Sequence, residues 1–267
     1  MDLRHSFWDV QETSLGFLTG LVAKEDSLFS DQSSFSVRFE WGAQGLEAIG
    51  PTSRVIVIVD VLSFCTCVDV AASRGAVVFP YRWRDDTAVR FATDRQAVLA
   101  DAHRTNAVYS LSPTSLAKIP SGTRLVLPSP NGATLSFQAM KFGTTVAACL
   151  RNAAAVARFA EAQGGPISVI ACGERWGDGT LRPAWEDGVG AGAVIAGLSG
   201  TRSPEAEAAY ASFRQTEADL HQRIEACSSG RELIERGFAD DVESAAAFNV
   251  STCVSILEGD AFVAYSQ

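Results

Sequence analysis

The feature that most constrains the fold of this chain is a short run of mainly β-branched residues, Arg54–Val59 (RVIVIV). A strand with one face in solvent alternates apolar and polar residues, but this run has no polar alternation. Such a pattern is typical of a strand that is covered on both faces, as at the centre of a doubly wound sheet. The run therefore predicts a central strand, and Asp60 follows directly at its carboxyl end.

Other short apolar segments alternate with helix-like segments along the chain. Further strands are expected at 35–41, 76–80, 107–111, 123–127, 144–148 and 167–171, and helices at 65–73, 87–102, 133–140 and 152–163. This alternation is typical of βαβ units. It predicts a three-layer α/β/α fold with a largely parallel or mixed central sheet.

The last part of the sequence predicts mainly helices. A tightly packed Gly/Ala-rich helix is expected after Gly188, where a GxGxxA pattern follows no strand and so indicates helix packing rather than a dinucleotide site. One amphipathic helix is expected over 203–227, then two short helices and a closing strand near 254–257 or 261–265. We expect residues 51–267 to form one compact domain, with residues 1–50 as an N-terminal extension and edge strand packed on it.

Composition narrows the classes of function. The 267 residues are 47% hydrophobic and carry a net charge of −9, so the chain can bury a core but offers no basic surface for nucleic acid or an anionic membrane. No apolar stretch is long enough to span a membrane, and the acidic residues near the start do not suit a signal peptide. Scattered cysteines and three distant histidines indicate reduced thiols and no structural zinc. These features predict a cytoplasmic protein, and an acidic protein that takes an anionic substrate needs local arginines or a metal to hold it.

Polar residues follow four of the expected strands. They are Asp60, the turn Ser129-Pro130-Asn131-Gly132, the pair Arg151-Asn152, and the pair Glu174-Arg175. In open α/β sheets, ligands bind beyond the carboxyl ends of the strands. We therefore expect these groups to meet at one rim of the sheet.

The densest group of charges lies in the segment Gly173–Asp187 (GERWGDGTLRPAWED). Its carboxylates are Glu174, Asp178, Glu186 and Asp187, and its guanidinium groups are Arg175 and Arg182. Carboxylate oxygens are ligands that Mg²⁺ prefers, and Mg²⁺ can polarise a phosphoryl oxygen. A solvated acidic loop with surface ion pairs is the alternative interpretation.

Two smaller motifs suit an anion. The Ser129-Pro130-Asn131-Gly132 turn would aim backbone N–H groups and the Ser and Asn side chains at an anion near a helix N-terminus, but the motif by itself favours simple turn and cap chemistry. Arg151-Asn152 offers a planar fork for phosphate or sulfonate, and an ion pair at a helix start is the alternative.

The motifs taken together resemble those of the 2-phosphosulfolactate phosphatase family. In order, they are Val59-Asp60-Val61-Leu62, Pro128-Ser129-Pro130-Asn131-Gly132, Cys149-Leu150-Arg151-Asn152-Ala153, Gly173-Glu174-Arg175 with Asp178-Gly179, Glu186-Asp187 with Gly190-Ala191-Gly192-Ala193, and Ser229-Gly230-Arg231-Glu232-Leu233. The resemblance implies an α/β/α fold and Mg²⁺-dependent hydrolysis of 2-phospho-3-sulfolactate to 3-sulfolactate and phosphate, a step in coenzyme M synthesis.

The resemblance also implies roles for individual residues. The expected metal ligands are Asp60, Glu174, Asp178, Glu186 and Asp187. The expected catalytic residues are Asp60, Glu186 and Arg151. The expected substrate contacts are Ser129, Asn131, Gly132, Asn152, Arg175 and Arg182.

The sequence departs from the family at two places. Ser63-Phe64 stands where the best-known members have Arg-Ala, and Tyr109–Ser115 (YSLSPTS) occupies the region of their Gly-Phe-Asp-Leu-Gly-Asn-Ser-Pro segment. Two other nucleophiles remain open, Asp60 through an aspartyl-phosphate and Cys65. A different Mg²⁺-dependent hydrolase or lyase, or a non-catalytic anion-binding protein, is the alternative function, and a homo-oligomer is also left open.

Overall fold

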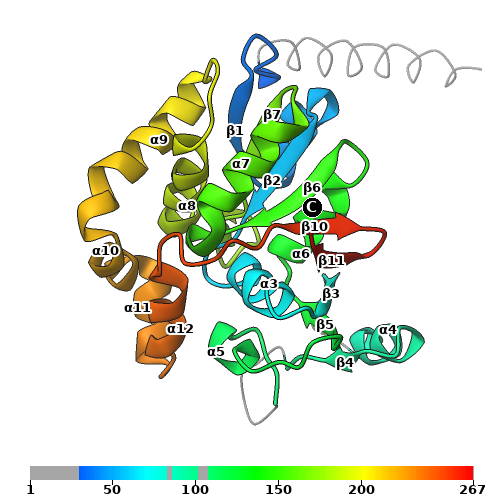
Figure 1. Cartoon of the computed structure of the whole chain (residues 1–267). Helices are drawn as coiled ribbons and strands as arrows, with labels where there is room; N and C mark the ends of the chain where they lie inside the picture. Colours follow the sequence, from blue (N-terminus) through cyan, green and yellow to red (C-terminus); the bar gives the residue numbers. More distant parts are fainter. Residues whose placement is uncertain (1–29, 83–85, 102–107, 267) are drawn as a thin grey trace, which may run out of the picture.

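The computed structural model describes residues 30–82, 86–101 and 108–266. In this part of the chain, one mixed sheet of nine strands carries helices on both faces, which confirms the expected three-layer α/β/α fold (Figure 1). The strands of this sheet are β1 (Val37–Trp41), β2 (Val55–Val59), β3 (Val77–Tyr81), β4 (Val98–Leu99), β5 (Arg124–Pro128), β6 (Thr144–Ala148), β7 (Ile167–Ala171), β10 (Ser255–Glu258) and β11 (Ala261–Ala264). A separate small hairpin pairs β8 (Glu174–Arg175) with β9 (Leu181–Arg182).

The sheet consists of two parallel groups joined by an antiparallel hairpin. The strand order is β1-β7-β2-β6-β10-β11-β3-β5-β4. The pairings β6–β10, β10–β11 and β11–β3 are antiparallel, and the remaining pairings in this sheet are parallel. Because three antiparallel pairings follow one another, β3, β5 and β4 run opposite to β1, β7, β2 and β6.

Strand β2 is buried on both faces, as its sequence predicts. Val55, Val57 and Val59 pack in one hydrophobic cluster with α7 (Ala153–Gln163) and α8 (Trp185–Ala196). Ile56 and Ile58 point to the opposite face, into a second cluster that includes residues of α2 (Gly42–Ile49), α3 (Phe64–Ala72) and α6 (Gly132–Ala139). The run of apolar residues without polar alternation thus packs into one hydrophobic cluster on each face of the sheet.

A further layer of helices lies beyond α8. Helix α9 (Pro204–Thr216) packs directly on α8, and α10 (Leu220–Ala226), α11 (Ser228–Glu235) and α12 (Ala239–Ala246) continue along the same side of the sheet (Figure 1). The Gly/Ala composition of α8 permits this close approach, since a Cβ on Gly192 would collide with the carbonyl oxygen of Ala209 in α9. The remaining helices are α4 (Thr87–Asp94) and α5 (Pro113–Leu116), with 3₁₀ turns at Gly50–Thr52, Leu150–Asn152 and Glu217–Asp219. None of the helices in the described part of the chain is long and apolar enough to cross a membrane.

Several predicted elements differ from the structure. The expected helix at 87–102 is wrong beyond Asp94, because the left-handed backbone at Gln96 (φ 50°) ends the helical path and β4 follows. The expected strand at 107–111 is wrong over its described residues, where Ser110 forms only an isolated bridge to Asp101.

The C-terminal third also corrects two predictions. The single helix expected over 203–227 is broken by the 3₁₀ turn Glu217–Asp219 into α9 and α10. The two alternatives for a closing strand both form, and they pair as β10 and β11. Within the expected N-terminal extension, β1 is an edge strand of the sheet, whereas residues 1–29 lie outside the described residues.

Candidate active site

Four carboxylates gather where β2 and β7 end against the start of α8. Asp60 follows β2, Glu174 lies three residues after β7, and Glu186 and Asp187 lie in the first turn of α8. Asp187 accepts hydrogen bonds from two backbone N–H groups, Val61 to Oδ1 at 2.7 Å and Gly173 to Oδ2 at 2.9 Å. It therefore ties the ends of β2 and β7 together at the N-terminus of a helix, where negative charge is favoured.

Asp60 is held in a similar way by the backbone. Its Oδ1 accepts a hydrogen bond from the N–H of Phe64 at 3.0 Å, and its Oδ2 accepts one from the N–H of Gly132 at 3.2 Å. A Cβ at Gly132 would collide with the Phe64 ring and crowd the Asp60 carboxylate. Glycine at this position is thus what allows the Ser129–Gly132 turn to approach Asp60.

The turn reaches Asp60 in a way that strand order alone does not explain. Strand β5, which precedes the turn, runs opposite to β2, so their carboxyl ends do not share an edge through strand direction. Helix α6 contacts β2, β3 and β6, and its first residue is Gly132. The packing of α6 on the sheet therefore brings the turn to Asp60.

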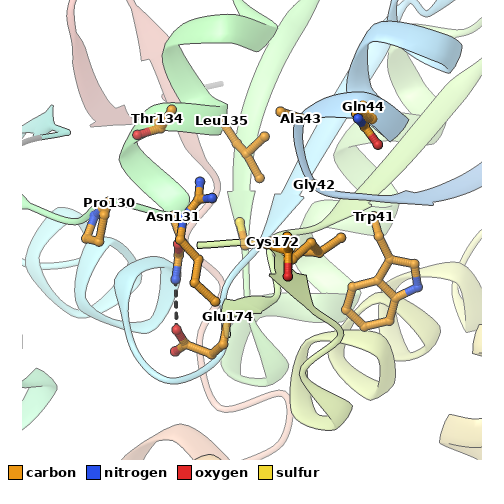
Figure 2. A pocket seen from close by; sticks show the side chains of 13 residues that line it. Trp41, Gly42, Ala43, Gln44, Pro130, Asn131, Thr134, Leu135, Cys172 and Glu174 are labelled. Carbon is orange, nitrogen blue, oxygen red and sulfur yellow. Dashed lines mark hydrogen bonds between the residues drawn. The ribbon is translucent and has the colours of Figure 1, made fainter. Parts of the chain in front are cut away.

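Asn131 connects the turn to the acidic cluster. Its side-chain amide Nδ2 donates a hydrogen bond to Oε2 of Glu174 at 2.9 Å, drawn as the dashed line in Figure 2. Of the expected substrate contacts, Ser129, Asn131, Arg175 and Arg182 therefore lie around the same carboxylates, with Gly132 against Asp60.

Burial and mutual repulsion raise the pKa of two of these carboxyl groups. The pKa of Glu174 rises to about 7, first because the group is buried and then because Asp60 and Glu186 are near, while Asn131 and Arg182 act in the opposite direction. Burial, followed by the charges of Asp60 and Glu186, raises the pKa of Asp187 well above its ordinary value. Burial and the neighbouring carboxylates thus disfavour the ionised form of both groups.

A polar cavity of about 250 Å³ opens onto this cluster. Asp60 and Glu174 lie on its wall, together with the guanidinium-bearing side chains of Arg175, Arg182 and Arg236. Hydroxyl groups complete the lining through Ser63, Ser129 and Ser229. Arginine and hydroxyl groups beside carboxylates are a set of side chains suited to binding a phosphorylated acid together with a cation.

The fit of this site to a divalent metal can be judged from its donor set. Within the described residues, no three His, Cys, Asp or Glu side chains already converge as a complete ligand set. Mg²⁺ does not require one, because it is commonly bound by one or two carboxylates plus water and substrate oxygens. Asp60 and Glu174, which line the cavity, supply the carboxylate oxygens that this requirement calls for.

Other residues of the predicted site lie elsewhere. The Nε atom of Arg151 forms an ion pair with Oδ2 of Asp69 at 2.9 Å, and its Nη1 atom donates a hydrogen bond to the carbonyl oxygen of Ser244 at 3.0 Å. Asn152 is fully buried, and its side chain bonds to the backbone of Cys149, Ala147 and Cys253. Both side chains are thus held by contacts within the fold, and Arg151 forms the ion pair that was the alternative to an anion-binding role.

Asp178 and Cys65 also lie in settings that differ from the carboxylate cluster. Asp178 is exposed in the turn between β8 and β9, where its Oδ1 accepts hydrogen bonds from the N–H and hydroxyl of Thr180. Cys65 is fully buried, and burial raises the pKa of its thiol well above the ordinary value. A thiol held protonated in this way is a poor nucleophile.

Several residues of the cavity wall were given no predicted site role from the sequence. Ser229, Glu232 and Arg236 come from α11 and the position after it, and Ser63 precedes α3. The motif Ser229–Leu233 did mark the start of α11, and Arg236 lies one helical turn after Glu232, whose Oε1 it contacts at 3.2 Å. The sequence signal for Arg236 was thus its helical spacing from a recognised motif.

Comparison with known proteins gives two matches. The profile of a family described as 2-phosphosulpholactate phosphatase matches residues 45–260. A protein of Gloeobacter violaceus (strain ATCC 29082 / PCC 7421), named "Probable 2-phosphosulfolactate phosphatase", is 33% identical over 129 residues, which cover 48% of this chain and 52% of that protein. The aligned segment thus spans about half the length of this curated relative. The family match extends from within α2 to the turn after β10 and includes every residue of the polar cavity, so the chain belongs to the 2-phosphosulfolactate phosphatase family.

Proposed function

We propose that this protein is a Mg²⁺-dependent phosphatase that hydrolyses the phosphate ester of a small acid, nominally 2-phospho-3-sulfolactate to 3-sulfolactate and phosphate. Family membership supports the reaction class. The observation that carries the proposal is the polar cavity, in which Asp60 and Glu174 face Arg175, Arg182 and Arg236. This arrangement places anion-binding groups and metal-binding groups within one small volume.

In the proposed reaction, the guanidinium groups bind the anionic substrate and offset charge on the transferring phosphoryl group. Arg182 is oriented for this role by a long 3.5 Å contact with the Ser229 hydroxyl and by its position over the Trp176 ring. Glu174 accepts a hydrogen bond from the side-chain amide of Asn131, and this bond holds the Glu174 carboxylate at the wall of the cavity.

Asp60 and Glu174 would hold the metal, and Mg²⁺ bound there would polarise a phosphoryl oxygen and orient the attacking water. Asp187 serves as a positioning residue, since both its oxygens accept backbone N–H groups. The competing mechanism uses Asp60 as a nucleophile that forms an aspartyl-phosphate. The backbone hydrogen bonds on both Asp60 oxygens fix the carboxylate in one orientation, which either mechanism needs.

The test is phosphate release from a panel of phosphorylated acids that includes 2-phospho-3-sulfolactate, with Mg²⁺ and with a chelator. The variants are Asp60→Asn and Glu174→Gln, and the matched control is Asp240→Asn, which replaces an exposed carboxylate of α12. We expect turnover only with a divalent cation, a loss of about 100-fold or more in kcat for Asp60→Asn, and wild-type rates for Asp240→Asn.

Absence of turnover on every substrate, or wild-type rates for both cavity variants, would contradict the phosphatase proposal. Binding of phosphorylated acids without hydrolysis would instead support a non-catalytic anion-binding protein. Release of a product other than phosphate from the same substrates would support a lyase.

A further inference from the structure

A second cavity, of about 340 Å³, adjoins the polar cavity (Figure 2). Its volume falls within the range of about 300–1,000 Å³ that is usual for small-molecule sites. The two cavities share four residues in their walls, Pro130, Asn131, Glu174 and Arg175. The two spaces therefore meet at the hydrogen-bonded pair Asn131–Glu174, which lines both of them.

The walls of this second cavity are largely apolar. Trp41, Leu135 and Leu181 provide its apolar surface, and Gln44, Thr134 and Thr180 provide neutral polar groups. Its two charged side chains, Glu174 and Arg175, are of opposite sign and lie on the side shared with the polar cavity. A sulfonate placed among the apolar residues would lose its hydration without gaining a net positive environment, whereas an aromatic or aliphatic group would be stabilised there.

The backbone around the second cavity fixes its shape. Gly42, with φ of 60°, turns the chain from β1 into α2, and a Cβ at this position would press against the Leu181 side chain at 3.3 Å. The Trp41 ring lies against Gly188, where a Cβ would be 3.2 Å away. Leu135 is 4% exposed, so its position is set by the core that includes α6. Three separate elements thus hold the three apolar side chains around the space.

The geometry points to the second cavity as the site for an apolar substituent of the substrate, so that the substrate is a 2-phospho acid with an aryl or alkyl group on carbon 3. This inference rests on the proposed phosphatase function. The phosphate and carboxylate bind in the polar cavity among the arginines, and the substituent lies between Trp41, Leu135 and Leu181. Such a substrate uses both spaces, whereas a small sulfonated acid has no group that matches the apolar walls.

The test compares three substrates that differ only at carbon 3. In 2-phospholactate this carbon is an unsubstituted methyl group, in 2-phospho-3-sulfolactate it carries a sulfonate, and in 2-phospho-3-phenyllactate it carries a phenyl ring. For the wild-type protein with Mg²⁺, we expect kcat/KM for the phenyl compound to exceed that for the methyl compound by about tenfold or more, as burial of an apolar group in a matching pocket allows. Leu181→Ala, which removes part of the wall, and Ala43→Phe, which fills the space, should both lower this ratio.

The control variant is Met140→Ala. Met140 has the same 40% exposure as Leu181 and lies at the end of α6, but it lines neither cavity. We expect it to keep the wild-type ratio, and thermal unfolding of each variant confirms that it is folded. A second measurement, calorimetric binding of unphosphorylated 3-phenyllactate, reports on the cavity without catalysis, and both wall variants should weaken it.

The outcomes separate the two proposals. If the sulfonate or methyl compound is turned over at least as well as the phenyl compound, or if the wall variants leave the ratio unchanged, the substrate inference is overturned and the phosphatase function stands. If no compound is hydrolysed but 3-phenyllactate binds and the wall variants weaken that binding, the cavity assignment is supported and the phosphatase function fails.

Discussion

At the scale of single residues, three buried carboxylates show how charge is held inside this protein. Asp187 and Asp60 each accept hydrogen bonds from two backbone N–H groups, so each carboxylate joins segments that are distant in the sequence. Asp69 is fully buried and relies on Arg151 and on the Ser251 hydroxyl. The chemistry of the site and the stability of the fold therefore depend on the same kind of contact.

The Arg151–Asp69 pair gives a stability prediction. Replacing Arg151 by Ala leaves the Asp69 carboxylate buried without its cation, so we expect the free energy of unfolding to fall by about 3 kcal/mol. The double variant Arg151→Ala, Asp69→Asn should recover part of this loss, because the unpaired charge is then absent. Urea unfolding measures both effects. A change in KM for Arg151→Ala without any loss of stability would instead make Arg151 a substrate contact.

Glu174 gives a prediction about pH and metal. Its pKa in the folded protein, about 7, lies above the ordinary value of 4.5, so the folded chain binds this proton more tightly than the unfolded chain. The stabilisation that this proton provides is complete below pH 4.5 and is lost as the pH rises toward 7. We expect Mg²⁺ to raise the melting temperature more at pH 8 than at pH 5, since it then balances ionised carboxylates. If Mg²⁺ raises the melting temperature equally at pH 5 and pH 8, this assignment is contradicted. It is also contradicted if Glu174→Gln shows the same difference between the two pH values as the wild-type protein.

At the scale of elements, α8 serves two purposes along its length. Its first turn carries Glu186 and Asp187, both almost fully buried. Further along, Gly190 lies against Val59 and Val61, and Gly192 lies against Ala209 of α9. Small residues thus let α8 lie between the sheet and α9 while its N-terminus supplies acidic groups to the site.

This close packing predicts a strong effect of one added methyl group. Gly192→Ala would force a Cβ onto the Ala209 carbonyl, so we expect a loss of about 1–3 kcal/mol in the free energy of unfolding. Gly177→Ala is the matched control, because no heavy atom lies within 4 Å of a Cβ at that position, and it should be nearly neutral. Thermal and urea unfolding of the two variants show whether glycine is needed at position 192 because α8 and α9 lie so close together, or because of its backbone flexibility.

Sequence patterns predicted the elements that are defined by local burial. The apolar segments at 54–59, 144–148 and 167–171 became β2, β6 and β7, because their side chains are buried whatever their neighbours are. The break between α9 and α10 and the short β4 were missed, since each depends on backbone turns that residue periodicity does not encode.

The candidate site was predicted in part for the same physical reason. Asp60 and Glu174 follow buried parallel strands, so the direction of β2 and β7 was enough to bring them together. Arg236 reaches the cavity through the packing of α11 against the core, a long-range contact that no strand end indicates. Arg151 also follows a strand, yet its side chain pairs with Asp69, a partner distant in the sequence, and so does not reach the cavity.

At the scale of the whole molecule, the β10–β11 hairpin joins the two halves of the sheet. It pairs with β6 on one side and with β3 on the other. Phe262 of β11 is fully buried and meets the Phe64 ring of α3 edge to face, with ring centroids 6.1 Å apart. Phe64 in turn donates its N–H to Asp60, which connects the hairpin to the site through one residue.

The hairpin's position predicts a global effect for a single core substitution. Phe262→Ala should lower the free energy of unfolding by about 3–5 kcal/mol, as expected when a large buried ring is removed. Val263→Ala, at the next and only partly buried position of the same strand, is the control and should cost clearly less. Circular dichroism of unfolding should show one transition for the whole chain. Two separate transitions would show that the halves of the sheet fold independently.

The position of this hairpin also has a consequence for the order of synthesis. Residues 255–264 leave the ribosome after both parallel groups of strands, yet they fill the gap between them. Until they emerge, β6 and β3 each have an edge without its final partner strand, and such edges readily pair with other chains. A nascent chain of this protein is therefore most prone to aggregate just before its sheet is closed, and slow translation of the stretch ahead of β10 would lengthen that interval.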